Sequence, residues 1–429
     1  MSLIFSKMQK HIDGFKSLTA NKNVLDVNDV AQVFIPLANG MSTAVELKVN
    51  VGDRVKVGSL IGHRNDFFYV PIFSSVSGTV VAIEKRTHGA GQIDHVVVEN
   101  DFKFEQAELD TINYETASRE ELVEFVKNKG IVGCGGAGFP TYVKYQKPEG
   151  INKVIINAVE CEPFITADYK EIEDNVRYLM TGVLAMQKMA EAKEVVIAIK
   201  TGKKLVTDIM NKALPNASVS VVEVPDAYPM GWERTLIRHL EKKEYENIPS
   251  EIGLIVNNST TAISLGMAME TGMPIVNKFV TVSGDALKDP VNVNVLVGTP
   301  VSKLLEITKL NRDEVVLING GPMMGNSMET DEFVITPNTN AITVMAEVVT
   351  EAISCLRCGS CSDHCPAGLQ PVRIMEAYKS QDWDEVRKLR ADKCIECGLC
   401  SYVCPSKIEV SNQVILAKRT IASLDKNRR

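Results

Sequence analysis

No stretch of this 429-residue sequence approaches the ~20 consecutive apolar residues that a membrane-spanning helix requires. The first twenty residues carry several charged side chains, which is not the pattern of a secretory leader. A basic excess is missing too, because 47 Lys and Arg stand against 54 Asp and Glu, and this argues against a nucleic-acid-binding surface. We therefore expect a cytoplasmic protein with no nucleic-acid partner and, at most, peripheral membrane association.

Cysteine is scarce except in one place. Eight of the ten cysteines lie in two runs, 355–366 and 394–405, which both read C-x2-C-x2-C-x3-C-P. Thiolates at every third residue can bind three corners of an iron–sulfur cube, while the cysteine before the proline binds the other cube. The spacing predicts two [4Fe–4S] clusters, one held by Cys355, Cys358, Cys361 and Cys404, the other by Cys394, Cys397, Cys400 and Cys365.

Two other uses of these cysteines are weaker. Structural zinc needs four ligands from paired C-x2-C turns and has no use for a third and fourth cysteine with a following proline. Disulfides are not required in a chain long enough to bury its own core. Cysteines committed to clusters indicate a reducing compartment, in agreement with a cytoplasmic location.

The chain is long enough for two to four domains, and we expect a multidomain α/β protein. Residues 1–30 show no period and are expected to form an N-terminal arm. Short alternating strands broken by glycine turns follow in 31–110 and resemble a biotinyl/lipoyl-type barrel-sandwich hybrid. Carrier domains of that type expose a lysine, but the corresponding stretch, 65–69, has none. This β unit is therefore interpreted as a structural or docking module.

Helices and strands alternate in 111–275, which predicts a parallel sheet covered on both faces, with ligands at the carboxyl ends of its strands. Short strands in 276–310 look like a β-grasp insert of the SLBB type, and 311–349 is expected to be a return segment. That segment contains the turn Gly320–Gly325, which could be purely structural, with its methionines in the core. Residues 350–429 are predicted to be a helical two-cluster ferredoxin-type domain, with a helix over 372–389 in which Trp383 packs.

A glycine-rich loop opens the α/β region. Gly133, Gly135, Gly136 and Gly138 match G-x-G-x-x-G, but the preceding segment 120–129 has helical spacing, so this is not a standard Rossmann turn. Glycines still let backbone N–H groups approach a phosphate, and the proline at 140 suits the start of a helix. The alternative is a glycine-rich turn that binds nothing.

Polar residues follow the next predicted strand. Asn157, Glu160, Glu162 and Asp168 lie where a sheet of this kind binds its ligand, and carboxylates there can accept hydrogen bonds from ribose hydroxyls. The alternative is that the two glutamates belong to a solvated loop.

Several motifs together resemble the RnfC family, which is distantly similar to the flavin- and NADH-binding subunit of respiratory complex I. They are the segments 133–141, 157–169, 228–229, 258–261 and 320–325, and the twin cysteine runs. The resemblance implies FMN surrounded by Gly133, Gly135, Gly136, Gly138 and Lys144, with Asn157 and Asn258 contributing. It also implies that Glu160 and Glu162 lie at the flavin–nicotinamide site.

The sequence departs from the Rnf subunit in places. The segment Lys10–Gly14 stands where Gly-His-Pro-Pro is expected, and a basic extended tail is missing. Cys134 replaces an apolar residue in the glycine loop. These features resemble the soluble, RnfC-like electron-transfer protein associated with proline reductase in amino-acid-fermenting anaerobes. Lys200 and Lys203 stand where the family leads us to expect acidic residues near the nucleotide.

Cys134 suggests a further role. A thiol at the amino end of a phosphate-binding helix has a lowered pKa and is reactive, so Cys134 is a candidate catalytic residue beside Glu160 and Glu162. The alternative is an inert small residue, and Cys161 is assigned no role beyond packing.

We therefore expect an NADH-dependent oxidoreductase that carries electrons through FMN and two [4Fe–4S] clusters to a partner such as D-proline reductase. One alternative is the peripheral RnfC component of a membrane Rnf complex that links NADH and ferredoxin. Another is an iron–sulfur docking relay without flavin.

Overall fold

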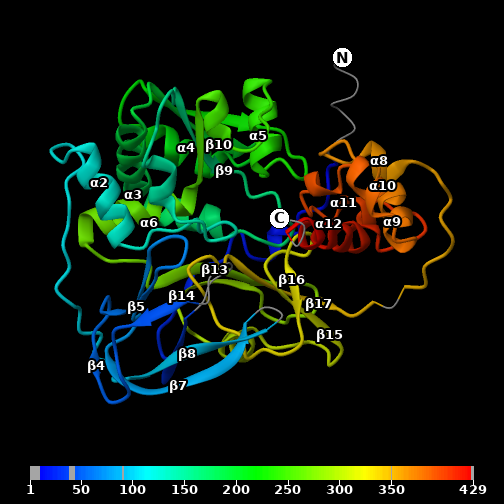
Figure 1. Cartoon of the computed structure of the whole chain (residues 1–429). Coiled ribbons are helices and arrows are strands. Elements are labelled where there is room, and N and C mark those ends of the chain that lie inside the picture. Colours follow the sequence, from blue (N-terminus) through cyan, green and yellow to red (C-terminus); the bar gives the residue numbers. More distant parts are fainter. Residues whose placement is uncertain (1–9, 38–43, 89–90, 349, 427–429) are drawn as a thin grey trace.

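The computed structural model describes residues 10–37, 44–88, 91–348 and 350–426. Residues 1–9 of the expected arm and the last three residues lie outside these ranges. Figure 1 shows an α/β unit and two β units packed together, with a helical unit to one side. Within the described ranges, no helix combines the length and apolar character needed to span a bilayer.

The barrel-sandwich unit consists of two antiparallel sheets. Val80, Val96 and Val98 belong to its core, and on β7 the neighbours of Val80, Thr79 and Val81, are more exposed. This confirms the predicted barrel-sandwich hybrid. One sheet contains β2 (Gln32–Pro36), β8 (Gly91–Asn100), β7 (Gly78–His88) and β4 (Arg54–Val55), and the other β3 (Val45–Leu47), β5 (Leu60–Arg64) and β6 (Val70–Phe73).

The α/β unit is built on a four-stranded parallel sheet in the order β11-β10-β9-β12. In β9, Val154 and Ile156 pack into the core that includes α3 and α6, whereas Ile155 packs on the opposite face with residues of α5. The predicted parallel sheet with two covered faces is therefore confirmed. The strands are β9 (Lys153–Ala158), β10 (Glu194–Lys200), β11 (Val219–Val224) and β12 (Leu254–Asn258); the helices are α2 (Arg119–Asn128), α3 (Ala167–Ala190), α4 (Lys204–Ala213), α5 (Glu233–Glu241) and α6 (Ser259–Thr271).

The second β unit is one six-stranded sheet with α7 (Val301–Thr308) packed into its core. The sheet joins residues of the expected insert, the return segment and the arm, because β1 pairs in parallel with β14. In spatial order its strands are β1 (Leu25–Val27), β14 (Val291–Leu296), β13 (Asn277–Ser283), β17 (Ala341–Ala346), β15 (Val315–Asn319) and β16 (Asn326–Met328).

The C-terminal unit is helical, as predicted. The prediction of a single helix over 372–389 is wrong in one respect, since the chain forms two helices there. Gln381 adopts a left-handed φ of 57°, and the Asp382 carboxylate accepts the Glu385 N–H at 3.0 Å to start the second helix. The helices are α8 (Ser360–Asp363), α9 (Pro371–Lys379), α10 (Trp383–Lys388), α11 (Leu399–Tyr402) and α12 (Val410–Lys426).

Candidate functional site

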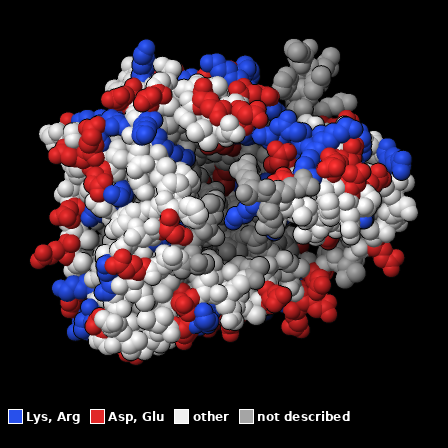
Figure 2. Space-filling model, viewed as in Figure 1, with Lys and Arg blue, Asp and Glu red and all other residues white. Residues whose placement is uncertain are grey.

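A cavity of about 630 Å³ lies where the α/β unit, the six-stranded sheet and the cluster unit meet. Its volume falls in the ~300–1,000 Å³ range typical of cofactor sites. Figure 2 shows the surface hollowed between the α/β unit and the helical unit. The lining includes Gly135–Ala137, Asn157, Glu160–Glu162, Asp168, Asn258, Gly320–Gly321, Asn338–Asn340, Cys394–Glu396, Lys418 and Arg419.

The glycine loop is closed at its base by an antiparallel bridge between Val132 and Pro140. Gly135 and Gly136 line the cavity, and a Cβ at Gly135 would lie 2.7 Å from Nδ2 of Asn258. Because glycine has no side chain, the backbone N–H groups at this point can approach a phosphate group closely. The expected roles of Gly133 and Gly138 are not supported in the same way, since neither lines the cavity. The helix after Pro140 is only a short 3₁₀ turn, Thr141–Tyr145.

Asn258 ends β12 and caps α6, accepting the Thr260 N–H at 2.7 Å. Its Nδ2 donates to the Asp168 carboxylate at 2.9 Å, and the Asp168 N–H donates to the Glu160 carboxylate at 3.0 Å. Nearby, Asn157 donates to the Gly231 carbonyl at 2.7 Å. One hydrogen-bond network thus connects the carboxyl ends of β9 and β12 to the start of α3.

The paired glutamates are not in a solvated loop. Burial raises the pKa of Glu160 to about 7, opposed by the nearby Lys16 ammonium, and burial also raises the pKa of Glu162 to about 7. One oxygen of Glu162 accepts the Met323 N–H at 3.1 Å, and the other is buried without a partner. Carboxyls with pKa values near neutrality can exchange protons under ordinary conditions. The turn 320–325 is therefore part of the cavity wall as well as a tight turn.

Cys134 does not have the character expected of a reactive thiol. Its side chain is buried and does not line the cavity. Burial raises its pKa, whereas a lowered pKa was predicted. The thiol contacts the Val132 carbonyl at 3.4 Å and the Ser264 hydroxyl at 3.8 Å. The structure therefore favours the alternative of an inert residue at Cys134, because the side chain is buried and does not line the cavity.

Three lysines also lie apart from the cavity lining. Lys144 donates to the Val256 carbonyl at 2.6 Å, so its ammonium is engaged by β12. Lys200 pairs with Asp226 at 2.8 Å, and Lys203 lies over the Tyr169 ring at 4.9 Å. Lys200 and Lys203 thus contact Asp226 and Tyr169, and neither lysine lines the cavity.

The cluster cysteines gather as the crossed pattern predicts. One cavity of about 220 Å³ is lined by Cys355, Cys358, Cys361 and Cys404, and another of about 20 Å³ by Cys365, Cys394, Cys397 and Cys400. Backbone N–H groups point at sulfur, as from Glu396 to Cys394 and from Leu369 to Cys365, both at 3.4 Å. Such N–H donors stabilise the thiolate form that binds iron.

The alternatives to clusters find no support. All ten cysteines lie within the described ranges and are free, so none of them forms a disulfide. Among the described residues, no group of three or more His, Cys, Asp or Glu is arranged to hold a single metal ion. Two sets of four thiols match the ligand number of two iron–sulfur cubes, and a bare-backbone loop beside a cavity of cofactor size fits FMN.

Several lining residues were not found by sequence reasoning. Asn338 donates to the Gly136 carbonyl at 2.9 Å, and Lys418 and Arg419 reach the cavity from α12. Lys16 of the arm contacts the loop after β9. These residues come from segments far apart in the sequence, and no local pattern marks them.

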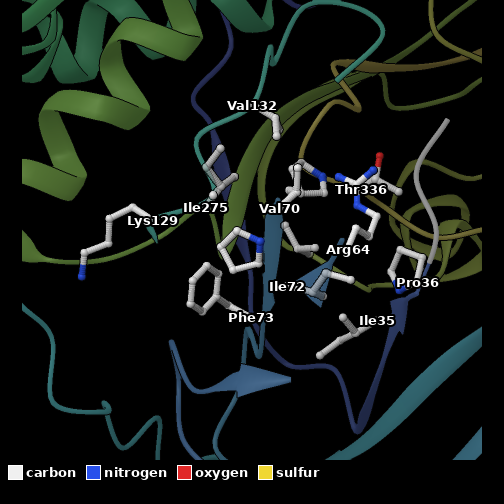
Figure 3. Close-up of a pocket in the computed structure, with 14 residues that line it drawn as sticks. Ile35, Pro36, Arg64, Val70, Ile72, Phe73, Lys129, Val132, Ile275 and Thr336 are labelled. Atoms are coloured by element: carbon white, nitrogen blue, oxygen red, sulfur yellow. The ribbon is translucent and has the colours of Figure 1, made fainter. Parts of the chain in front are cut away.

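A further cavity, of about 50 Å³, lies between the barrel-sandwich unit and the segment that follows α2. Figure 3 shows the side chains of Ile35, Val70, Ile72 and Phe73 gathered around it. It is too small for a nucleotide and is interpreted as a packing gap between units.

Comparison with known proteins agrees with this arrangement. Family models match over residues 9–103 (RnfC barrel sandwich hybrid domain), 126–266 (Nuo51 FMN-binding domain) and 347–414 (4Fe-4S dicluster domain). A solved NAD+-reducing [NiFe]-hydrogenase chain is similar in fold, with a TM-score of 0.52 at 16% identity, over 70% of this chain and 61% of that one.

Curated relatives cover most of the chain. One component of the proton-translocating ferredoxin:NAD(+) oxidoreductase complex of Clostridium ljungdahlii is 33% identical, over 85% of this chain and 82% of its own length. Its counterpart in the Na(+)-translocating complex of Acetobacterium woodii is 32% identical, over 91% and 90%. The chain spans about half (48%) of the corresponding component of the Vibrio cholerae ion-translocating oxidoreductase complex, at 34% identity.

The fold and the site define an electron-transfer oxidoreductase whose cofactors are FMN and two [4Fe–4S] clusters. The chain belongs to the RnfC family.

Proposed function

We propose that this chain takes electrons from NADH at the central cavity and delivers them to a partner at the surface of the cluster unit. The observation that carries the proposal is that one cavity is lined both by the glycine loop and by Cys394. When bound, FMN accepts two electrons together and releases them singly, and each cluster carries one electron.

The residues of the cavity have distinct tasks in this proposal. Backbone N–H groups at Gly135 and Gly136 would hold the phosphate of FMN. The Asn258–Asp168–Glu160 network would keep the cavity wall in place for the flavin and the nicotinamide. Glu160 and Glu162, with pKa values of about 7, take up and release protons as the flavin changes its charge.

The two cysteine sets differ in position, which gives the electrons a direction. Cys394 lines the cavity, so a cluster held by its set of cysteines would be the one placed to receive electrons from a bound flavin. Cys358 is exposed, so the cluster of Cys355, Cys358, Cys361 and Cys404 faces a partner.

The partner proposed first is the membrane part of an ion-translocating ferredoxin:NAD+ oxidoreductase of the Rnf type. The names and coverage of the curated relatives support it. A second candidate is a cytosolic reductase such as D-proline reductase. The observation that favours it is the Lys10–Gly14 segment, which departs from the Gly-His-Pro-Pro expected in the Rnf subunit.

The test is anaerobic purification with iron, sulfide and flavin quantified, followed by NADH titration under visible and EPR spectroscopy. We expect about eight irons per chain and bleaching of a bound flavin before the cluster signals appear. Clusters without flavin, and no response to NADH, would favour the docking relay. Membrane proteins or a soluble reductase recovered with the tagged chain distinguish the two partners.

A further inference from the structure

The N-terminal arm packs along the wall of the cavity. Lys10 forms an antiparallel bridge with Tyr228, and the Phe164 N–H donates to the Gly14 carbonyl at 2.7 Å. The rings of Phe15 and Phe164 stack with centroids 4.8 Å apart. These contacts place the arm directly behind the loop that connects β9 to α3.

Lys16 extends from this arm into the loop. Its ammonium donates to the backbone carbonyls of Glu160 at 3.1 Å, Glu162 at 2.8 Å and Ile165, and it lies 3.3 Å from the Glu160 carboxylate. The side chain of Lys16 is 10% exposed and that of Glu160 is 4% exposed. These acceptors are enough to satisfy the three N–H donors of a buried ammonium.

The loop has no regular secondary structure of its own, and three of its carbonyls, those of residues 160, 162 and 165, accept hydrogen bonds from Lys16. Glu160 and Glu162 both belong to it and both line the cavity. An ammonium bonded to three of its carbonyls therefore sets the loop's shape, and through it the direction of both carboxylates.

Other charges surround this contact. Lys200 and Lys203 oppose the Lys16 charge, and Glu160 stabilises it. The titratable and charged groups that face the pair from the surrounding elements are Cys161, Glu162, Asp168, Tyr169, Lys200, Lys203 and Asp226. Among the described residues, Glu160 is the carboxylate that lies within ion-pair distance of the Lys16 ammonium. The ion pair is therefore specific to these two residues.

We propose that Lys16 is a positioning residue of the flavin–nicotinamide site: its ammonium shapes the Glu160–Ile165 loop and holds the Glu160 carboxylate toward Asp168. This inference rests on the proposed function of the cavity. It gives the arm a task in the reaction, beyond its packing against the α/β unit.

The test uses the full chain with Lys16→Met, Lys16→Arg and a matched control, Lys22→Met. Lys22 belongs to the same arm and donates to the Pro290 carbonyl at 2.7 Å, away from the cavity lining. The first measurement is hydrogen–deuterium exchange of the peptide that contains 160–166. Lys16→Met should exchange there about tenfold faster or more, because charged hydrogen bonds that close the loop are lost. The control should match the wild type.

The second measurement is stopped-flow reduction of the bound flavin by NADH across pH, at equal flavin and iron content. We expect Lys16→Met to slow reduction about 100-fold, as misplaced reacting groups do. The inflection of its pH profile should move to higher pH, because the Lys16 ammonium no longer lowers the pKa of Glu160. Lys16→Arg keeps the positive charge and should recover part of the rate.

The outcomes separate cleanly. An unchanged rate and pH profile in Lys16→Met overturn the proposal, whether or not exchange rises. If NADH fails to reduce wild-type flavin, the proposed function falls, and unchanged exchange in Lys16→Met then overturns the loop assignment as well. Should Lys16→Met not fold, Lys16→Arg decides through loop exchange and rate. A guanidinium cannot reproduce the ammonium's three-carbonyl geometry, so faster exchange over 160–166 and slower flavin reduction than in wild type are expected, and wild-type values for both overturn the proposal.

Discussion

The phenol of Tyr228 donates a hydrogen bond to the carbonyl of Cys397 at 2.7 Å. Tyr228 follows β11 in the α/β unit, and Cys397 belongs to the cysteine set beside the cavity. The tyrosine is 1% exposed, so the bond is shielded from water. A buried hydrogen bond thus joins the α/β unit, next to the cavity-lining Pro229, to a cysteine of the cluster unit.

Tyr228→Phe is expected to weaken this junction. The change leaves the Cys397 carbonyl without its partner and should cost about 1–3 kcal/mol, the usual effect of an unsatisfied buried group. Thermal unfolding of the anaerobic, cofactor-loaded chain measures the loss. Tyr402→Phe is the control, because Tyr402 lies in the same unit as Cys397 but is 51% exposed. Equal melting temperatures for the two variants would contradict the prediction.

Serine substitution of the cysteines tests the crossed pairing. Cys404→Ser should lose the same cluster as Cys358→Ser, although Cys404 lies in the other run, and Cys365→Ser should match Cys394→Ser. Iron content should fall from about eight to about four in each case. EPR of the reduced protein shows which cluster remains. Loss of the cluster of a cysteine's own run would refute the crossed arrangement.

Gly135→Ala should impair flavin binding. The added Cβ would lie 2.7 Å from Asn258 Nδ2, which caps α6 and bonds Asp168. Overpacking of this kind costs about 1–3 kcal/mol, so we expect roughly tenfold weaker FMN binding in fluorescence titration. Gly133→Ala is the matched control, since its nearest contact would be an ordinary 3.6 Å. Similar affinities for both variants would count against the loop as the phosphate site.

Stability of the flavin-free chain should depend on pH through Glu162. Burial raises its pKa from 4.5 to about 7, so the folded chain binds more protons than the unfolded chain between these values. The stability that protonated Glu162 contributes is therefore fully present below pH 4.5 and is lost as the pH rises through 7. At pH 8, Glu162→Gln should be more stable than wild type by at most about 3 kcal/mol.

Urea unfolding at pH 5 and pH 8 measures this difference. The advantage of Glu162→Gln should be several-fold smaller at pH 5. Glu105→Gln serves as a control, because Glu105 is an exposed glutamate that pairs with Lys56 at 3.7 Å. An equal advantage at both pH values would show that the effect is not one of protonation.

Periodicity and spacing predicted the parts of the molecule that depend on local order. The alternation of helices and strands in 111–275 indicated a parallel sheet covered on both faces, and the cysteine spacing predicted the grouping of thiols, because both patterns follow from backbone geometry. The break at Gln381 was missed, since helical spacing continues across it and only the left-handed backbone interrupts it.

The remainder of the site depends on tertiary contacts. Lys16 is one charged residue in an arm without a period, and nothing nearby in the sequence indicates the loop that it enters. The surroundings of Cys134 depend on such contacts too. Its position in a glycine loop suggested a lowered pKa, but the direction of its side chain is set by the packing of α6 against the loop.

Because Lys418 and Arg419 of α12 help to line the flavin cavity, the redox units of this protein are not interchangeable modules. A version of the chain cut before the cysteine runs would keep its glycine loop yet leave the cavity open on one side. Transplanting another ferredoxin domain onto the same flavin unit would change the flavin's surroundings along with its electron acceptor. Selection on the cluster unit is therefore also selection on the chemistry of the flavin, and the two would be expected to evolve together.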